Sequence, residues 1–121
     1  MEFDIEALQE LGGATIQTST IWTEGVQSFT GVPMKTLVAE FGLTSGSLRA
    51  SAINDYAIDF PVEDAMKDGP MIAYHRNGKP MTVRDKGPLW IVFPFDSDPK
   101  FQTEVVHARS IWQLDRIEIL D

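Results

Sequence analysis

The sequence predicts an α+β domain with β-rich mixed sheets and short helices. Strand-like segments separated by turns follow one another along the chain, and one pair flanks Asn77-Gly78, a strong hairpin signal. Only two segments show a helical pattern, and each begins with a proline and is followed by a glycine. Hairpins and mixed spacing are not the pattern of a doubly wound parallel sheet, so that class is disfavoured.

The first elements lie before residue 42. Thr15 to Thr20 alternates weakly and is predicted to be a strand, and Trp22 to Gly25 reads as a loop. A helix is predicted over 33–41, because apolar residues recur at helical spacing between Pro33 in the first turn and Gly42 as the stop.

The middle of the chain predicts a strand pair and a helix. Leu48 to Ile53 and Tyr56 to Phe60 are strand-like, and the turn-prone pair Asn54-Asp55 separates them. A short helix follows over Pro61 to Lys67, with Gly69 past its end.

The remaining elements are strands. Met71 to Tyr74 and Pro80 to Val83 form the predicted hairpin, and the apolar run Leu89 to Phe93 is expected to be a buried central strand. Arg116 to Leu120 is predicted as the last strand. We expect one domain over 1–121, in which residues 1–13 are an N-terminal extension of a domain at 14–121.

Composition excludes several classes of function. The 121 residues carry a formal net charge of −8, which repels phosphate backbones, so nucleic acid is not expected as a partner. The absence of cysteine excludes disulfides, zinc–thiolate sites and cysteine nucleophiles. No apolar window of about 18 residues suggests a membrane span. The acidic start Met1 to Glu6 is unlike a signal peptide, so we expect either a cytoplasmic protein or one whose leader has been removed.

Common catalytic and metal motifs are also missing. His75 and His107 have no ligand-type spacing to each other or to carboxylates, so no metal site is expected. No hydrolase nucleophile elbow, dinucleotide fingerprint or P-loop occurs. We therefore expect no catalytic residues.

Two carboxylates differ from the others because each precedes an aromatic residue at a strand edge. Asp55 lies next to Tyr56, and Asp85 lies five residues before Trp90. A carboxylate accepts two parallel N–H bonds, the geometry offered by a guanidinium or by the amino-pyrimidine edge of guanine or a pterin. Alternatively, Asp55 caps a turn and Asp85 pairs with Arg84 or Arg109.

Several stretches together resemble a known family. They are Phe29-Thr30-Gly31-Val32-Pro33-Met34, Asn54-Asp55-Tyr56, Asp64-Ala65, Ala73-Tyr74 with Asn77-Gly78-Lys79-Pro80-Met81, Gly87-Pro88-Leu89 and Arg109-Ser110-Ile111-Trp112. Their order and spacing over Phe29 to Leu120 resemble the molybdopterin-binding domain of the sulfite oxidase type. The resemblance implies that family's mixed α+β fold and a pterin site. Small stand-alone members of this fold tend to be exported, which implies a periplasmic location.

The chain departs from the family pattern where the cofactor is held. The family's molybdenum ligand is a Cys in a C-A-G-N stretch, and Ser51-Ala52-Ile53-Asn54 aligns there. A hydroxyl is a poor substitute for a thiolate on a soft metal. The family's phosphate-binding H-G-x-P-L-R aligns with Asp85 and Trp90, so its cations are lost. The departures suit a neutral pterin without molybdenum.

The leading hypothesis is therefore a non-catalytic domain that binds a free, reduced, non-phosphorylated pterin and is sensed by a membrane-bound signalling protein. Two alternatives stay open: a molybdopterin-dependent oxidoreductase domain or subunit, and a relic of the fold used only for protein–protein contact. In the first hypothesis an aromatic residue stacks on the ring and polar groups read its edge. The expected pterin-binding residues are Trp22, Asn54, Asp55, Tyr56, Arg84, Asp85, Trp90, Arg109, Ser110 and Trp112.

Overall fold

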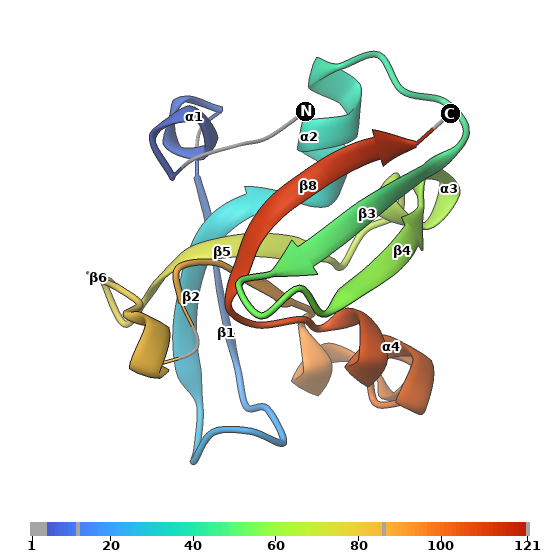
Figure 1. The fold of residues 1–121 in the computed structure, drawn as a ribbon. Helices are drawn as coiled ribbons and strands as arrows, with labels where there is room; N and C mark the ends of the chain where they lie inside the picture. Colours follow the sequence, from blue (N-terminus) through green and yellow to red (C-terminus); the bar gives the residue numbers. More distant parts are fainter. Residues whose placement is uncertain (1–4, 12, 86, 121) are drawn as a thin grey trace.

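The described residues form two antiparallel sheets and four short α-helices, with further 3₁₀ helices between them (Figure 1). The structure is a computed structural model that describes residues 5–11, 13–85 and 87–120. Sheets dominate the fold and the helices are short, which confirms the α+β class expected from the sequence.

The first sheet has five strands. They are β1 (Ala14–Thr18), β2 (Gln27–Pro33), β5 (Met71–Arg76), β6 (Lys79–Pro80) and β7 (Trp90–Val92). The order is β1-β2-β5-β6, and β7 pairs with the other end of β5. The predicted hairpin at Asn77-Gly78 joins β5 to β6, but β6 ends at Pro80, where a strand to Val83 was expected. Beyond it Met81 turns into the core, and the chain enters a 3₁₀ helix, η1 (Val83–Asp85).

The second sheet has three strands, with β3 (Ser47–Ala52) between β4 (Ala57–Pro61) and β8 (Leu114–Leu120). The β3–β4 connection confirms the predicted Asn54-Asp55 turn. The Asp55 N–H donates to the Ala52 carbonyl at 3.0 Å, and Asp55 takes a φ of 68°, a left-handed conformation that Asp tolerates.

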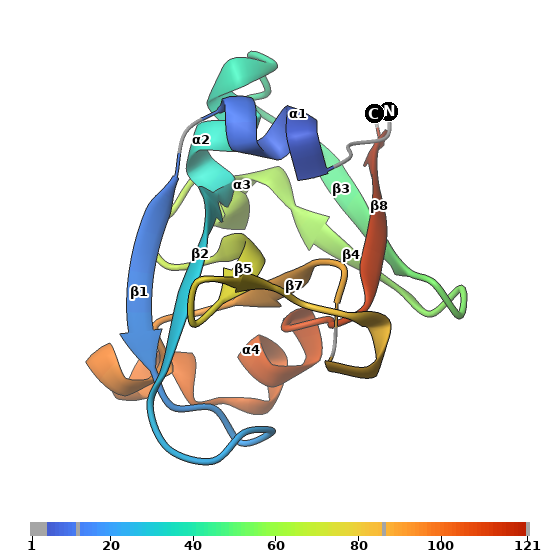
Figure 2. The same ribbon diagram turned by 90° about the vertical axis from the view of Figure 1, so that its left-hand side faces the viewer.

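Helices lie at both ends of the molecule (Figure 2). The helices α1 (Ile5–Glu10), α2 (Met34–Glu40) and α3 (Val62–Ala65) lie toward one end, and α4 (Glu104–Arg109) lies at the other. Two further 3₁₀ helices, η2 (Phe95–Ser97) and η3 (Pro99–Phe101), lead toward α4. The positions of α2 and α3 match the two predicted helices, whereas α4 was not predicted.

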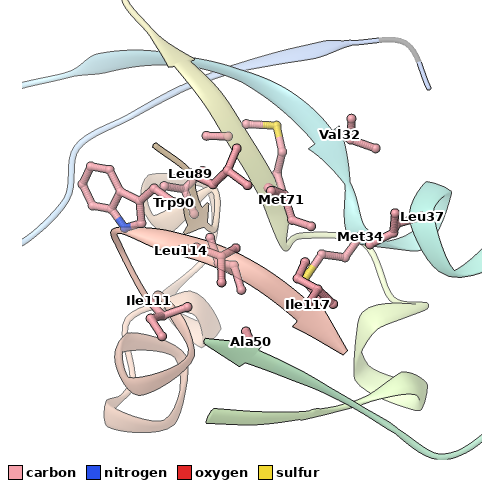
Figure 3. Packing of buried hydrophobic residues seen from close by; sticks show 14 of the residues in the cluster. Val32, Met34, Leu37, Ala50, Met71, Leu89, Trp90, Ile111, Leu114 and Ile117 are labelled. Atoms are coloured by element: carbon pink, nitrogen blue, oxygen red, sulfur yellow. The ribbon is translucent and has the colours of Figure 1, made fainter. Parts of the chain in front are cut away.

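The strand β7 is fully buried, as expected for the apolar run Leu89 to Phe93, but it is not central. It pairs with β5 alone among the described strands of its sheet. Its other side bonds to the C-terminal segment: the Ile91 N–H donates to the Ile111 carbonyl, and the Leu114 N–H to the Leu89 carbonyl, each at 2.9 Å. The run is buried because it belongs to a hydrophobic cluster that includes residues of both sheets, and Figure 3 shows Leu89 and Trp90 next to Leu114.

Segment 1–13 contributes to the core through α1, because Leu8 is completely buried in the main hydrophobic cluster. No helix among the described residues is long and apolar enough to cross a membrane.

Candidate ligand-binding cleft

A cleft of about 300 Å³ lies where α4, the segment from Ser110 to Gln113, and the β3–β4 turn meet. The connection between β1 and β2 adds Trp22 to its wall. This volume is at the lower end of the range for small-molecule sites, which suits a ligand of one or two rings.

Aromatic rings form one side of the cleft. Trp22 meets Trp112 edge to face, with ring centroids 5.3 Å apart at an interplanar angle of 67°. It meets His107 of α4 in the same way, at 5.6 Å and 78°. Tyr56 adds a half-exposed phenol from the β3–β4 turn. These rings offer apolar faces to a flat ligand.

Two hydrogen bonds hold the turn that carries Asn54 and Tyr56. The Tyr56 N–H donates to Asn54 Oδ1 at 3.1 Å, which closes an Asx-type turn. The Ile53 N–H donates to the Gln113 carbonyl at 2.9 Å and ties this turn to the segment before β8. Gln113 takes a φ of 54°, a left-handed conformation that is uncommon for a residue other than glycine.

The α4 end of the cleft is fixed by hydrogen bonds. Thr103 caps the helix by accepting from the Val106 N–H at 3.2 Å, and Glu104 places an acidic group in the first turn. Ser110, just past the helix, donates its hydroxyl to the Val106 carbonyl at 2.8 Å. These contacts stabilise both ends of α4 and so help to position His107 and Ala108 in the cleft wall.

Aromatic, amide, hydroxyl and aliphatic groups form the walls of the cleft, together with the imidazole of His107. Among the described residues, no lysine, arginine, aspartate or glutamate lines it. Its chemistry is therefore that of aromatic stacking and of hydrogen bonds from amide, hydroxyl and phenol groups.

Half of the sequence-predicted ligand residues come together in this cleft. They are Trp22, Asn54, Tyr56, Ser110 and Trp112. The remaining predicted residues lie elsewhere or cannot be assigned to the cleft.

Trp90 lies in the core and offers no face to a ligand. Its side chain is completely buried, and its Nε1–H donates to the Ser110 carbonyl at 3.2 Å. We expected it among the pterin-binding residues. It lies inside because β7 belongs to the main hydrophobic cluster. It contacts two residues of the cleft wall, Trp22 with ring centroids 6.0 Å apart and Ser110 through its carbonyl.

The charged residues expected at the site have other partners or positions. Asp55 is 87% exposed and pairs with Arg116 at 3.2 Å, which raises the pKa of that guanidinium. Arg109 points to the other side of α4, where it bonds Asp64 at 2.8 Å and lies over the Phe60 ring. Arg84 is exposed in η1. The side chain of Asp85 lies outside what the structure describes.

The cleft also contains residues that the sequence did not indicate. They are Ala52, His107, Ala108, Ile111 and Gln113. Three of them depend on α4 or its C-terminal end. The sequence did contain a signal for that helix. It consists of a capping threonine at 103, an acidic residue at 104 and basic residues at 107 and 109.

Residues 7–120 match the family model described as the oxidoreductase molybdopterin binding domain. The chain belongs to this family. The match spans the two sheets and the cleft, and it begins within segment 1–13, in agreement with the burial of Leu8. No curated protein matches the chain significantly.

The family's cofactor can be tested against the residues that are present. Ser51, at the aligned ligand position, lies in β3 with only 3% of its surface exposed, and the chain contains no cysteine. A serine hydroxyl does not replace a soft thiolate on molybdenum. Trp90, aligned with a phosphate-binding cation, is core. The described residues also contain no cluster of three metal-ligating side chains. This donor set does not fit a phosphorylated molybdenum cofactor.

Proposed function

We propose that this protein binds a free, reduced, non-phosphorylated pterin in the cleft without molybdenum, and that it is not an enzyme. The observation that carries the proposal is the wall of the cleft, which combines indole and phenol rings with amide and hydroxyl groups and has no cation for a phosphate among its described residues. A neutral bicyclic heterocycle needs an aromatic face and polar partners for its edge.

The ligand-bound protein would be sensed by a membrane-bound signalling protein in the periplasm. This part of the proposal rests on the absence of a catalytic constellation among the described residues and on the resemblance to small exported members of the fold. A physical route exists, because α4 has His107 on the cleft and Val105, 59% exposed, on the surface. A ligand that orders α4 would change what a partner meets.

The first experiment is a calorimetric titration with tetrahydropterin and oxidised pterin, with molybdenum assayed on the same sample. We expect saturable one-to-one binding without metal. Stoichiometric molybdenum with no pterin binding would instead support the family's oxidoreductase chemistry. Absence of both would support a role in protein–protein contact alone.

A matched pair of variants tests the location. Tyr56→Ala removes a cleft ring that is already 55% exposed, so the free energy of unfolding should change little while pterin affinity falls. We expect about a tenfold loss, the magnitude typical of one aromatic contact. Phe41→Ala at the end of α2 is the control, since it removes a partly exposed ring outside the cleft. Equal affinities of the two variants would place the ligand elsewhere.

The sensing step is tested by hydrogen–deuterium exchange of the protein with and without tetrahydropterin. We expect slower exchange across Glu104–Arg109 in the bound protein, because the ligand contacts one face of α4. If exchange across α4 does not change on binding, the ligand does not alter this helix, and a partner could not sense the bound state there.

A further inference from the structure

Hydrogen bonds inside the protein determine which polar atoms the cleft can offer to a ligand. Asn54 and Gln113 each have an amide with one donating and one accepting end, and Ser110 has a hydroxyl that can do both. In each of these side chains a backbone partner already uses one of the two capacities. What remains has a definite pattern of donors and acceptors.

Asn54 is left as a donor. Its Oδ1 accepts from the Tyr56 N–H at 3.1 Å, which fixes the orientation of the amide and leaves Nδ2 to donate. The bond cannot form with the amide turned over, because both groups would then be donors.

Gln113 is left as an acceptor. Its Nε2 donates one of its two hydrogens to the Val83 carbonyl at 2.9 Å, and because a carbonyl can only accept, this bond fixes the orientation of the amide and leaves Oε1 as its accepting end. The backbone holds this residue in place, since its φ is 54° and its carbonyl accepts from Ile53.

Ser110 is also left as an acceptor. Its hydroxyl hydrogen is used in the 2.8 Å bond to the Val106 carbonyl, so Oγ retains only its lone pairs for a ligand. Ser110 lines the cleft and is nearly fully buried, with 1% of its surface exposed.

We propose that Asn54, Gln113 and Ser110 form one donor and two acceptors that select a 2-amino-4-oxopyrimidine edge. That edge presents the reverse pattern: the 4-oxo group accepts, and N3–H and the 2-amino group donate. Asn54 binds the oxo group, and the two acceptors take the N–H groups. This inference rests on the proposed pterin site and assigns its specificity, without the carboxylate that the sequence suggested.

The edge chemistry predicts the ranking of three related ligands. The 6,7-dimethyl derivatives of pterin, lumazine and 2,4-diaminopteridine have the same bicyclic shape but different edges. Lumazine replaces the 2-amino donor with an acceptor, and the diamino compound replaces the 4-oxo acceptor with a donor and removes N3–H. A cleft with fixed polarity rejects mismatched edges because buried polar groups are left unpaired.

The experiment measures affinities for these three compounds by calorimetry, in oxidised and tetrahydro forms under anaerobic conditions. We expect the pterin to bind at least about tenfold more tightly than either analogue, the ratio for one unmatched polar group. Similar affinities for all three would overturn the inference while leaving pterin binding intact. No binding of any of them would instead overturn the proposed function.

A fourth ligand distinguishes a pterin from a guanine, because both ring systems carry the same 2-amino-4-oxopyrimidine groups. We expect 9-methylguanine to bind more weakly than the pterin, since its five-membered ring carries a methyl group where the pterin ring continues. If 9-methylguanine binds more tightly, the edge assignment is supported, but the ligand is a guanine and the proposed pterin function is wrong.

Matched variants test the named atoms. Gln113→Leu removes one acceptor, and we expect the preference for the pterin to fall at least fivefold over the analogue that lacks the group bound by Gln113. That analogue is 2,4-diaminopteridine if the group is N3–H, and lumazine if it is the 2-amino group. The control is Gln102→Leu, because Gln102 also donates Nε2 to a backbone carbonyl, that of Phe95 at 2.8 Å, but lies outside the cleft. A purely structural role of Gln113 would lower all affinities together and leave the preference unchanged.

Asn54→Asp reverses the polarity of the donor. Asp can keep the bond from the Tyr56 N–H but replaces Nδ2 with an oxygen, so the pterin's 4-oxo group is repelled and the diamino compound's 4-amino group is favoured. We expect the ratio of the two affinities to shift toward the diamino compound. Asn77→Asp is the control, since Asn77 likewise accepts from a backbone N–H, that of Ser28, in a distant turn. Equal shifts in both variants would overturn the role of Asn54.

Discussion

At the scale of single residues, Trp90 and Trp112 show how one side-chain type serves two purposes. Trp90 is fully buried and forms an edge-to-face contact with Phe29 at 5.3 Å, whereas Trp112 is partly exposed at the cleft. Sequence context did not separate them, because each directly follows an apolar residue that comes after a polar or turn-forming pair, Gly87-Pro88 or Arg109-Ser110. Only the tertiary position of β7, within the hydrophobic cluster that the two sheets share, decides that Trp90 belongs to the core.

These positions predict opposite effects of truncation. Trp90→Ala should lower the free energy of unfolding by about 3–5 kcal/mol, because it leaves a large cavity and removes an internal hydrogen bond. Compared with Trp90→Ala, Trp112→Ala should lower the free energy of unfolding less and weaken pterin binding more. Urea unfolding and ligand titration of both variants check this, and a larger stability loss for Trp112→Ala would contradict it.

Asp96 provides a pH-dependent contact at the same scale. Its carboxylate accepts from the Ser19 hydroxyl and from the Ser19 N–H, both at 2.6 Å, and joins η2 to the end of β1. These bonds, the hydroxyl bond first, lower the pKa of Asp96 below its usual 3.8. A pKa lowered by folding stabilises the protein above the unfolded pKa, and the contribution is lost as the pH falls through the folded pKa.

Asp96→Asn should therefore reduce the midpoint of thermal unfolding near neutral pH. The difference in midpoint between the variant and the parent protein should become smaller as the pH falls below 3.8. Glu24→Gln, in the exposed β1–β2 connection, controls for the loss of one negative charge. A difference in midpoint that is the same at neutral and acidic pH would show that ionisation of Asp96 does not contribute to stability.

At the scale of elements, the sequence was sufficient to predict a turn or the start of a helix where one or two residues specify it. The Asn77-Gly78 hairpin, the Asn54-Asp55 turn and the proline at the start of α2 are such cases. The strand β2 was missed because a bulge between Thr30 and Gly31 breaks its alternation. Gly31 is needed there, since a Cβ would lie 2.0 Å from the Ile72 carbonyl oxygen.

The cleft was only partly predictable for a related reason. Asn54 and Tyr56 share a turn, and Ser110 and Trp112 share a segment, so each pair was visible in the sequence. The charged residues were misplaced because a sequence shows which carboxylates and guanidinium groups exist but not their partners. Asp64, from α3, takes Arg109 away from the cleft.

The helix α4 is short, so its cap should matter for both stability and binding. Thr103→Ala removes the acceptor for the Val106 N–H, and we expect a loss of about 1 kcal/mol in the free energy of unfolding. Pterin affinity should fall as well, because α4 positions His107 and Ala108. Unfolding and titration measure both effects, and Thr103→Ser should restore them. Unchanged affinity in Thr103→Ala would show that the cleft does not depend on this cap.

At the scale of the whole molecule, the net charge of −8 contrasts with a cleft in which none of the described lining residues is a lysine, arginine, aspartate or glutamate. The affinity for a neutral pterin should change less than about twofold between roughly 50 and 500 mM NaCl at neutral pH, because screening acts on charges. A phosphorylated pterin should bind weakly and improve with salt, since screening reduces its repulsion by the acidic protein. Strong weakening of neutral-pterin binding by salt would reveal a charged contact.

The edge-to-face contacts of Trp22 have an optical consequence. Trp22 lies 5.3 Å from Trp112 and 6.0 Å from Trp90, and these three are all the tryptophans in the chain. At such separations excitation energy migrates between indoles, so the three emit as one coupled chromophore. A ligand that touches only Trp22 or Trp112 would therefore quench the buried Trp90 too, and the intrinsic emission of the unlabelled protein becomes a direct reading of cleft occupancy.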